Sequence, residues 1–400
     1  MEDVSGLIAK QYEAWAYPPP FRDIEAMLEG GYVQMGDPAL YSAALWPEGR
    51  PREKLRILVA GCGTVQAAVL AYTNRQCEVI GIDLSEASLA HERFLQDRHA
   101  LTNLGLYRGD LRDARKLGRN FDLVISTGVL HHMSDPGEGL RALADVLAPD
   151  GVFVGMVYAA TRRTGIYMIQ DALRRMDVKA DEGGVAFTRQ VLSALPQGHF
   201  VHRYTEVASE LEHDAALVDT FLNPQDRAYT VPQLFDFIGN SGLAFQHWVE
   251  PSWYYPEGAF APDSPVSLRL SRLSARDQWS AVEMLTAQIA THVFIARPTT
   301  LAPSAYLLDF NSDEAMGYAP LIAPGIQRTG PASYERQPLQ FQLGPAEEAL
   351  FTRADGRRTL AELLDHPQLS RLHDRNDFGR LVMSHLWKLG HLMVSKKPLH

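Results

Sequence analysis

The chain has few of the features that identify metal, redox or membrane proteins. It contains 2 cysteines, Cys62 and Cys77, whose spacing matches no metal-binding pattern and favours a reducing compartment. Its longest apolar run, Gly151 to Ala160, is too short to cross a bilayer. Its first residues lack the basic-then-apolar pattern of a signal peptide. We therefore expect a cytoplasmic protein with no membrane partner and no bound metal.

An excess of positive charge is missing as well. The sequence has 38 Lys and Arg residues against 48 Asp and Glu residues, which gives a formal net charge of −10. This balance disfavours a nucleic-acid partner unless a local basic patch exists. The apolar content of 46% and the charged content of 22% are typical of a globular protein. Because 400 residues exceed a single core of ordinary size, we expect two or three domains.

A glycine-rich turn after an apolar run is the most informative feature that is present. Residues 57–64 read Ile-Leu-Val-Ala-Gly-Cys-Gly-Thr, a buried strand followed by a sharp turn whose backbone can approach a ligand closely. A second apolar run ends in Asp83, about 20 residues later, as one βαβ unit requires. A carboxylate there can bind two ribose hydroxyls. Val65 stands where a pyrophosphate-binding loop has its third glycine, which favours a nucleoside cofactor without phosphates.

Strand and helix patterns alternate from residue 55 to residue 160. Ser85 is a predicted helix N-cap, and Asp135 is another, followed by a proline at the first helical position. The apolar run over 152–158 predicts the fifth strand, and residues 291–296 predict a strand that closes the sheet. The alternation predicts a doubly wound parallel sheet with a ligand at the carboxyl ends of its strands.

Six short motifs occur in a recognisable order. They are Val59–Thr64, Gly81–Ser85, Gly109–Leu111, Phe121–Val124, Gly128–Met133 and Leu147–Gly151. In this order they resemble the motifs of class I S-adenosylmethionine-dependent methyltransferases. The resemblance implies an α/β fold with a Rossmann-like seven-stranded sheet, S-adenosyl-L-methionine as cofactor, and methyl transfer by in-line displacement. Val59 departs from the acidic residue usual at its position, a carboxylate that often orients the methionine end of the cofactor.

The resemblance also assigns the residues that contact the cofactor. Asp83 is expected to bind the ribose, and Asp110 is expected to bind the adenine amino group, although an Asp in a loop can serve turn chemistry alone. Tyr12 and Tyr17 belong to a Gln-Tyr-Glu…Tyr-Pro segment similar to one in some bacterial methyltransferases, and they either cover the cofactor or pack on the core. The expected cofactor-binding residues are Gly61, Cys62, Gly63, Thr64, Gln66, Asp83, Leu84, Asp110, Leu111, Thr127, Gly128, Val129, Tyr12 and Tyr17.

Polar residues at the same edge of the sheet are candidates for catalysis. His131 and His132 follow the fourth strand and Tyr158 ends the fifth. Each histidine can act on the acceptor as a base or hydrogen-bond donor, or serve only the local turn. Tyr158 can bind an acidic or hydroxylated acceptor, or form ordinary surface contacts. Residues 219–229 form a candidate substrate wall. The expected substrate-binding residues are Arg162, His213, Asn223 and Tyr229.

The predicted organisation has four parts. Residues 1–50 form an aromatic N-terminal segment, and residues 51–300 form the methyltransferase domain with a substrate-covering insertion at about 178–230. Residues 301–335 are irregular, and residues 336–400 form a small winged-helix-like α+β domain with helices near 345, 360 and 378–389 and a strand near 391–394.

Two functions remain open from the sequence. The first is a methyltransferase acting on a small molecule or peptide. The second is a binding or regulatory protein that uses a methyltransferase scaffold and acts through its C-terminal domain, which could also support partner docking or a homodimer. A nucleic-acid methyltransferase ranks third because the chain is acidic.

Overall fold

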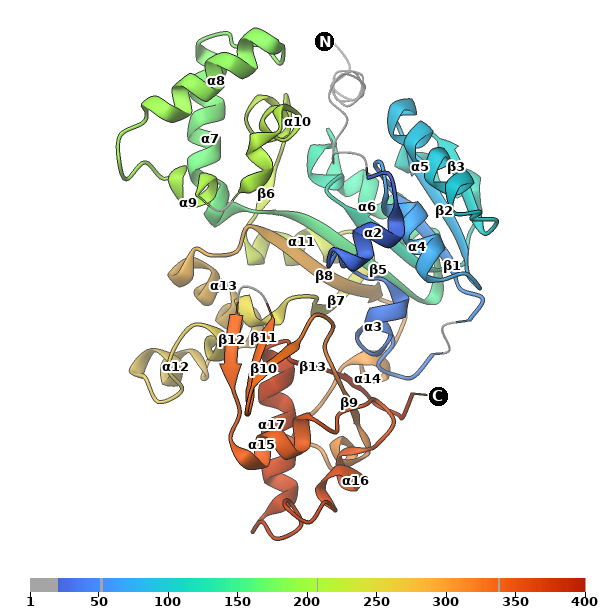
Figure 1. Cartoon of the computed structure of the whole chain (residues 1–400), viewed down its shortest axis with the longest axis vertical. Coiled ribbons are helices and arrows are strands. Elements are labelled where there is room, and N and C mark those ends of the chain that lie inside the picture. Colours follow the sequence, from blue (N-terminus) through green and yellow to red (C-terminus); the bar gives the residue numbers. More distant parts are fainter. Residues whose placement is uncertain (1–20, 51–52, 207, 337–338, 400) are drawn as a thin grey trace. The chain divides into compact units, whose positions relative to one another are not determined.

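The computed structural model describes residues 21–50, 53–206, 208–336 and 339–399. The chain divides into two compact units, each built from separate segments (Figure 1). Unit 1 comprises the chain up to Met27, Lys54–Phe245 and Glu283–Pro298. Unit 2 comprises Leu28–Glu53, Gln246–Val282 and Thr299–His400. The N-terminal tyrosines Tyr12 and Tyr17 lie outside the described residues.

The main sheet has the strand order β3-β2-β1-β4-β5-β8-β7, and the short strand β6 pairs with β5. Strands β1 to β5 are parallel, and β8 runs antiparallel to β5. The sheet has the expected Rossmann-like arrangement, but it is mixed rather than fully parallel. The direction of β8 was not predicted, because a hydrophobic pattern does not show whether a strand runs parallel or antiparallel to its neighbour. The strands are β1 (Arg56–Ala60), β2 (Glu78–Asp83), β3 (Leu104–Arg108), β4 (Phe121–Thr127), β5 (Leu147–Ala159), β6 (Ala228–Tyr229), β7 (Leu243–Trp248) and β8 (Thr291–Pro298).

Helices flank this sheet, and two of them, α5 and α6, begin at the predicted caps. The Ser85 side chain accepts a hydrogen bond from the Ser88 amide at 3.2 Å, and Asp135 accepts one from the Glu138 amide at 2.9 Å. Both caps satisfy amides that the first helical turn leaves unpaired. The helices are α2 (Ile24–Glu29), α4 (Gln66–Thr73), α5 (Glu86–Arg98), η1 (Leu111–Leu117), η2 (Leu130–His132), α6 (Pro136–Ala144), α11 (Val231–Gly239) and α13 (Ala275–Thr286).

An insertion between β5 and β6 forms a helical subdomain of unit 1. Its apolar side chains make a separate buried cluster that includes Ile166, Leu173 and Phe221. Gly165 allows α7 to pack closely against the backbone at Val201, since a Cβ at position 165 would lie 2.3 Å from the Val201 nitrogen. The insertion contains α7 (Ala160–Arg175), α8 (Glu182–Ala194), α9 (His202–Thr205), η3 (Ser209–Glu212), α10 (Asp214–Leu217) and the π-helix η4 (Val218–Leu222).

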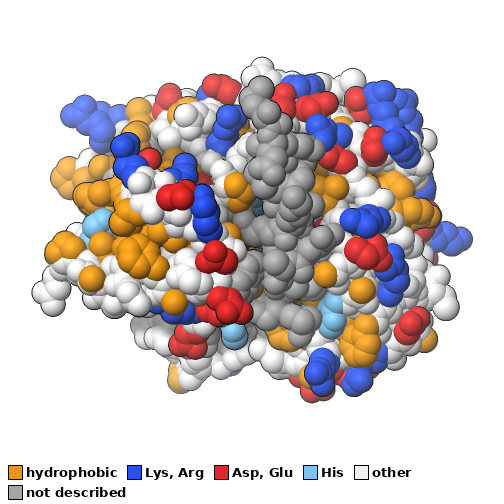
Figure 2. Space-filling view, turned by 90° about the horizontal axis from the view of Figure 1, so that it is seen from above, with side chains coloured by type: hydrophobic (Ala, Val, Ile, Leu, Met, Phe, Trp, Pro, Cys, Tyr) orange, Lys and Arg blue, Asp and Glu red, His pale blue; other side chains and the backbone are white. Residues whose placement is uncertain are grey.

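Charges of both signs are interspersed over the face shown in Figure 2, with hydrophobic side chains between them. The electrostatic potential of this visible, described part of the surface is therefore mixed in sign. Within the described residues, no helix combines the length and apolar character needed to span a bilayer.

Unit 2 has its own core and two small antiparallel sheets. Strand β9 pairs with the C-terminal β13, and β11 lies between β10 and β12. Leu350, Phe351 and Met383 are among the side chains of its buried cluster. The elements are α3 (Pro38–Leu45), η5 (Pro251–Trp253), η6 (Pro256–Gly258), α12 (Pro265–Leu270), α14 (Pro303–Tyr306), η7 (Asp313–Gly317), β9 (Ala319–Ile322), β10 (Gln327–Gly330), β11 (Ser333–Arg336), β12 (Leu339–Gln342), α15 (Pro345–Phe351), α16 (Leu360–Leu364), α17 (Arg375–Lys388) and β13 (Leu392–Ser395).

Strands β9 and β10 lie in a segment expected to be irregular. Each has four residues, and β9 contains Pro320. The partner of β9 is about 70 residues further along the chain, in β13. Local sequence patterns carry no signal for such a pairing. The capping box of Thr359 and Glu362 at α16 is present as expected.

Candidate functional site

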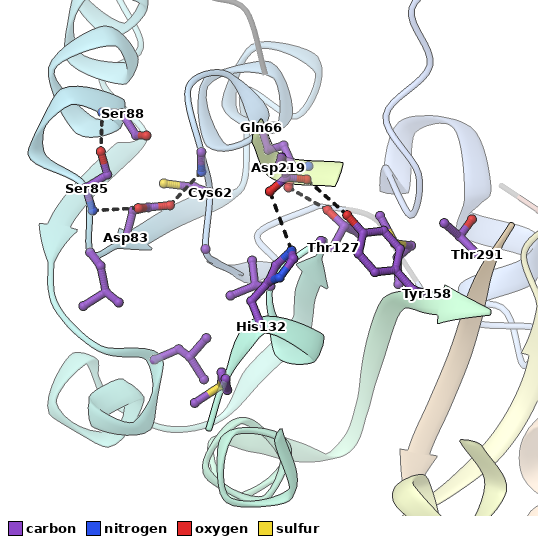
Figure 3. A pocket seen from close by; sticks show the side chains of 18 of the residues that line it. Cys62, Gln66, Asp83, Ser85, Ser88, Thr127, His132, Tyr158, Asp219 and Thr291 are labelled. Atoms are coloured by element: carbon purple, nitrogen blue, oxygen red, sulfur yellow. Dashed lines mark hydrogen bonds and ion pairs between the residues drawn. The ribbon is translucent and has the colours of Figure 1, made fainter. Parts of the chain in front are cut away.

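A cavity of about 440 Å³ lies at the carboxyl ends of β1, β2 and β4 in unit 1 (Figure 3). Its volume falls in the range of small-molecule sites. Its lining includes Gly61, Cys62, Gly63, Gln66, Asp83, Leu84, Asp110, Leu111, Thr127, Gly128 and Val129, all expected cofactor contacts. Thr64 is buried beside them and is not part of the lining. We call the wall formed by these lining residues the glycine-loop side.

Two loops meet closely at the end of β1 because Gly61 has no side chain. Gly61 has a φ of +77°, and a Cβ there would lie 2.2 Å from Cγ2 of Val129, in the loop after β4. Gly63 also has a positive φ of +58°. Left-handed backbone angles of this kind favour glycine. Glycine at position 61 thus lets the loops after β1 and β4 pack together, and Gly61, Gly63 and Val129 all line the cavity.

Asp83 at the end of β2 connects the strand to both neighbouring loops. Its Oδ2 accepts a hydrogen bond from the Gly63 amide at 2.9 Å, and its Oδ1 accepts one from the Ser85 amide at 2.9 Å. Burial raises the pKa of Asp83, although these amides oppose the shift. A carboxylate has about four acceptor positions, so with backbone hydrogen bonds from Gly63, Leu84 and Ser85 Asp83 retains capacity for a hydroxyl donor from the cavity.

Asp110 lines the cavity and also has the turn role that the sequence offered as an alternative. It caps η1 by accepting a hydrogen bond from the Arg112 amide at 2.8 Å. Burial acts to raise the pKa of Asp110, but the hydrogen bonds from Arg112 outweigh burial and lower it. Asp110 is therefore held as a carboxylate, able to accept a hydrogen bond from an amino group.

The other wall of the cavity contains His132, Tyr158 and Asp219, and we call it the His132 side. Figure 3 shows the three side chains turned toward one another. The Tyr158 hydroxyl donates to Asp219 Oδ2 at 3.2 Å, and His132 Nε2 lies 3.9 Å from Asp219 Oδ1. His132 Nδ1 lies 3.1 Å from the Gln225 carbonyl oxygen. Since a carbonyl can only accept, Nδ1 carries the hydrogen and Nε2 faces Asp219.

Buried groups on α7 support this wall, and one of them, Arg163, also lines the cavity. The Arg163 guanidinium lies 3.6 Å over the Tyr158 ring and pairs with the buried Asp226. Gln170 donates to Asp226 at 3.2 Å and to the Thr220 carbonyl at 2.9 Å. Gln170 thus satisfies a carbonyl of the π-helix that carries Asp219, a helix type that often occurs at functional sites.

His131 does not reach the cavity. It is fully buried, and its ring packs against Tyr158 in a tilted arrangement with a centroid distance of 3.8 Å. Burial lowers the pKa of His131 well below its usual value and raises the pKa of Tyr158 well above its own. Both rings are therefore neutral, and the Tyr158 hydroxyl keeps the hydrogen that it donates to Asp219.

The expected substrate residues lie in different places. Arg162 lines the cavity, and its guanidinium donates to the Gln288 and Arg203 carbonyls at 3.1 and 2.7 Å. Asn223 donates to Asp219 Oδ1 at 3.3 Å and supports the wall rather than lining it. His213 precedes α10, and Tyr229 stacks on Phe237 at 5.0 Å; neither is part of the lining.

Several lining residues had no individual assignment from the sequence. Asp219 and Thr220 fall in the expected substrate wall, but Tyr204 and Glu210 come from parts of the insertion without a recognisable motif. A spacing argument could not place them, because their approach to the cavity depends on how α7 and η4 pack. Among the described residues, no group of three or more His, Cys, Asp or Glu side chains has the arrangement of a metal site.

Comparisons with known proteins agree with this geometry. A family model described as a methyltransferase domain matches residues 51–164. An uncharacterized protein of Synechococcus sp. is 33% identical over 313 residues, which cover 73% of this chain and 71% of that protein. A ubiquinone biosynthesis O-methyltransferase of Ruegeria pomeroyi is 33% identical over 106 residues, which cover 26% of this chain and 41% of the relative.

A solved structure shares the fold over most of the chain. PKMT2 from Rickettsia typhi has a TM-score of 0.65 at 14% identity, and the alignment covers 94% of this chain and 77% of that one. The complex of PKMT2 with AdoHcy has a TM-score of 0.63 at 14% identity, covering 91% and 76%. At this identity the likeness establishes a common fold.

Proposed function

This chain belongs to the class I S-adenosylmethionine-dependent methyltransferases, and from that premise we propose that it methylates an oxygen or nitrogen atom that arrives bearing a hydrogen. The acceptor in this proposal is a small molecule or a peptide, and His132 is the general base. The observation that carries the proposal is the 3.9 Å approach of His132 Nε2 and the Asp219 carboxylate on one wall of the cavity.

The glycine-loop side fits the cofactor of this family. S-adenosylmethionine, when bound, supplies an activated methyl group on a sulfonium. Gly61 and Gly63 line the cavity at the end of β1 with backbone alone, and the Asp83 carboxylate beside them can accept a hydrogen bond from a ribose hydroxyl. Asp110 lines the same wall as a carboxylate suited to an amino group. These residues support a nucleoside at this wall.

The His132 side supports proton removal from the acceptor. Because Nδ1 of His132 bears the hydrogen, its Nε2 lone pair is directed toward Asp219, which is also an acceptor. A hydroxyl or amine placed there can donate to one of them. As His132 takes the proton, the carboxylate of Asp219 stabilises the resulting imidazolium.

Asp219 is itself held in place by two neighbours. Tyr158 and Asn223 donate to its two oxygens at 3.2 and 3.3 Å. His132, Asp219 and Asn223 are all buried, so the proton is transferred away from bulk water. Positioning of this kind can contribute roughly 7–11 kcal/mol to a reaction between two bound groups.

The test supplies purified protein with S-adenosylmethionine and panels of phenols, alcohols, amines and short peptides, and measures S-adenosylhomocysteine formation. With a productive acceptor, His132→Asn is expected to lower the rate about 10²- to 10⁴-fold, the usual contribution of a general base. Calorimetry should show unchanged affinity of this variant for the cofactor, since His132 lies on the opposite wall.

Two results would contradict the proposal. One is turnover confined to thiol or carbon acceptors while hydroxyls and amines fail. The other is a His132→Asn variant that is as fast as the unmodified protein. The matched control is His213→Asn, a histidine of the insertion outside the cavity lining, which should leave the rate unchanged.

A further inference from the structure

We propose that Glu92, a residue outside the cavity, is a positioning residue for the cofactor because its carboxylate holds the glycine loop in its binding conformation. Glu92 lies on α5 and is fully buried. It is not among the residues that line the cavity. Its effect on the cofactor therefore passes through the first turn of α4 and the loop before it.

Both oxygens of Glu92 are used by α4. Oε1 accepts a hydrogen bond from the Ala67 amide at 3.0 Å, and Oε2 accepts one from the Ala68 amide at 2.8 Å. These amides belong to the first turn of α4, where a capping side chain usually accepts them. The N-cap residue is Val65, whose side chain has no acceptor. The neighbouring helix thus supplies the cap that the loop lacks.

The first turn of α4 is tightly packed against the glycine loop and β2. A Cβ on Gly81 would lie 2.9 Å from the Ala67 Cβ and 3.1 Å from the Cys62 sulfur. The Cys62 thiol is also hydrogen-bonded to Glu92. A displacement of this turn would therefore move the loop that contains Cys62 and Gly63.

The same loop is connected to the expected ribose ligand. The Gly63 amide donates to Asp83 Oδ2 at 2.9 Å. Glu92 and Asp83 thus hold the loop from its two ends, Glu92 through α4 and Asp83 through the amide of Gly63. The strand β1 contributes no acidic residue, since Val59 stands two positions before Gly61.

The charge state of Glu92 decides how many of these bonds it can make. Burial raises the pKa of Glu92 to about 8, while the amides of Ala67 and Ala68 act to lower it. The titratable groups that act on it are Cys62 and Asp83. The ionised carboxylate accepts from both amides, whereas the protonated acid places a hydrogen against one of them. Ionised Glu92 therefore holds the loop more firmly.

The test is calorimetric binding of S-adenosylhomocysteine to the full chain at pH 6.5 and pH 9. Glu92→Gln keeps the shape but turns an amide group toward one of the two donors, as protonation does. At pH 9 the variant is expected to bind about tenfold more weakly, roughly the effect of one lost hydrogen bond to a charged group. At pH 6.5 the two proteins should differ less than about twofold, since unmodified Glu92 is then protonated.

Glu283→Gln is the matched control. Glu283 is also fully buried and also accepts a hydrogen bond from a first-turn amide, that of Val231 on α11, at 2.8 Å. Burial raises its pKa to about 7. Its replacement should lower the melting temperature without changing the affinity for the ligand. The ligand's own amino group also titrates in the alkaline range in every variant, so the difference between variants is the quantity to compare.

Two results would overturn the proposal. One is that Glu92→Gln and the unmodified protein bind S-adenosylhomocysteine with equal affinity at pH 9. The other is that Glu92→Gln and Glu283→Gln lose equal amounts of this affinity. If Glu92→Gln does not fold, Glu92→Asp takes its place, because it keeps the charge on a shorter side chain. It should bind more weakly yet retain the pH dependence, and loss of that dependence with unchanged affinity would contradict the role assigned to Glu92.

Discussion

The glycine-loop side of the cavity comes from loops that directly follow parallel strands, whereas the His132 side is completed by a helical insertion. Gly61, Asp83 and Asp110 follow β1, β2 and β3 in turn. Asp219 is instead carried by a π-helix, about 90 residues after His132. The wall that carries the expected cofactor contacts therefore depends on the sheet, while the wall proposed for the acceptor depends on how one insertion packs.

Removal of Asp83 should give the largest effect on the glycine-loop side. Asp83→Ala deletes the acceptor of the Gly63 amide and of the expected ribose hydroxyls. Two lost hydrogen bonds to a charged group predict about a hundredfold weaker binding of S-adenosylhomocysteine, measured by calorimetry. The control Asp135→Ala removes a helix cap and should cost about 1 kcal/mol of stability with no change in affinity. Similar losses in both variants would remove the special role of Asp83.

A smaller effect, confined to turnover, is expected on the His132 side. Asp219→Asn removes the charge beside His132 but keeps an oxygen for the Tyr158 hydroxyl. We expect the methyl-transfer rate to fall about tenfold, as one lost charge interaction of about 1.4 kcal/mol predicts, while cofactor affinity is unchanged. Rates come from S-adenosylhomocysteine formation with a productive acceptor.

The insertion offers a control for that variant. Asp214→Asn changes an exposed aspartate that pairs with Arg189 on α8, so its rate should equal that of the unmodified protein. If Asp219→Asn weakened cofactor binding as much as Asp83→Ala, the two walls would not act separately, and the comparison would fail.

The sequence predicted the glycine-loop side nearly residue by residue. Strand ends, glycines with positive φ and helix caps such as Ser85 depend on neighbours close in the chain. Local patterns pointed to Gly61 and Asp83, the resemblance to the family added Asp110, and all three line the cavity. Thr64 was the exception, since it is buried next to the lining.

The His132 side could be predicted only in part. His132 follows a predicted strand and Tyr158 ends another, but His131 lies in the core, where its ring packs on Tyr158. His213 and Tyr229 were expected to contact substrate and instead lie outside the lining, because the register of the insertion is set by tertiary packing. Strand β9 was not predicted either, because its partner strand β13 lies far away in the sequence, near the end of the chain.

The role of Glu92 could not be predicted from the sequence at all. Its sequence context is an ordinary amphipathic helix, in which a glutamate is usually exposed. The structure instead buries it against the amides of α4. Spacing alone gives no sign of this arrangement, since it depends on the contact between two helices.

A crystal structure of the protein with S-adenosylhomocysteine tests the division between the two walls most directly. We expect the ribose hydroxyls to donate to Asp83 and the sulfur to face the wall formed by His132, Tyr158 and Asp219. A ligand whose sulfur faces away from that wall, or a cavity that stays empty at saturating ligand, would contradict it.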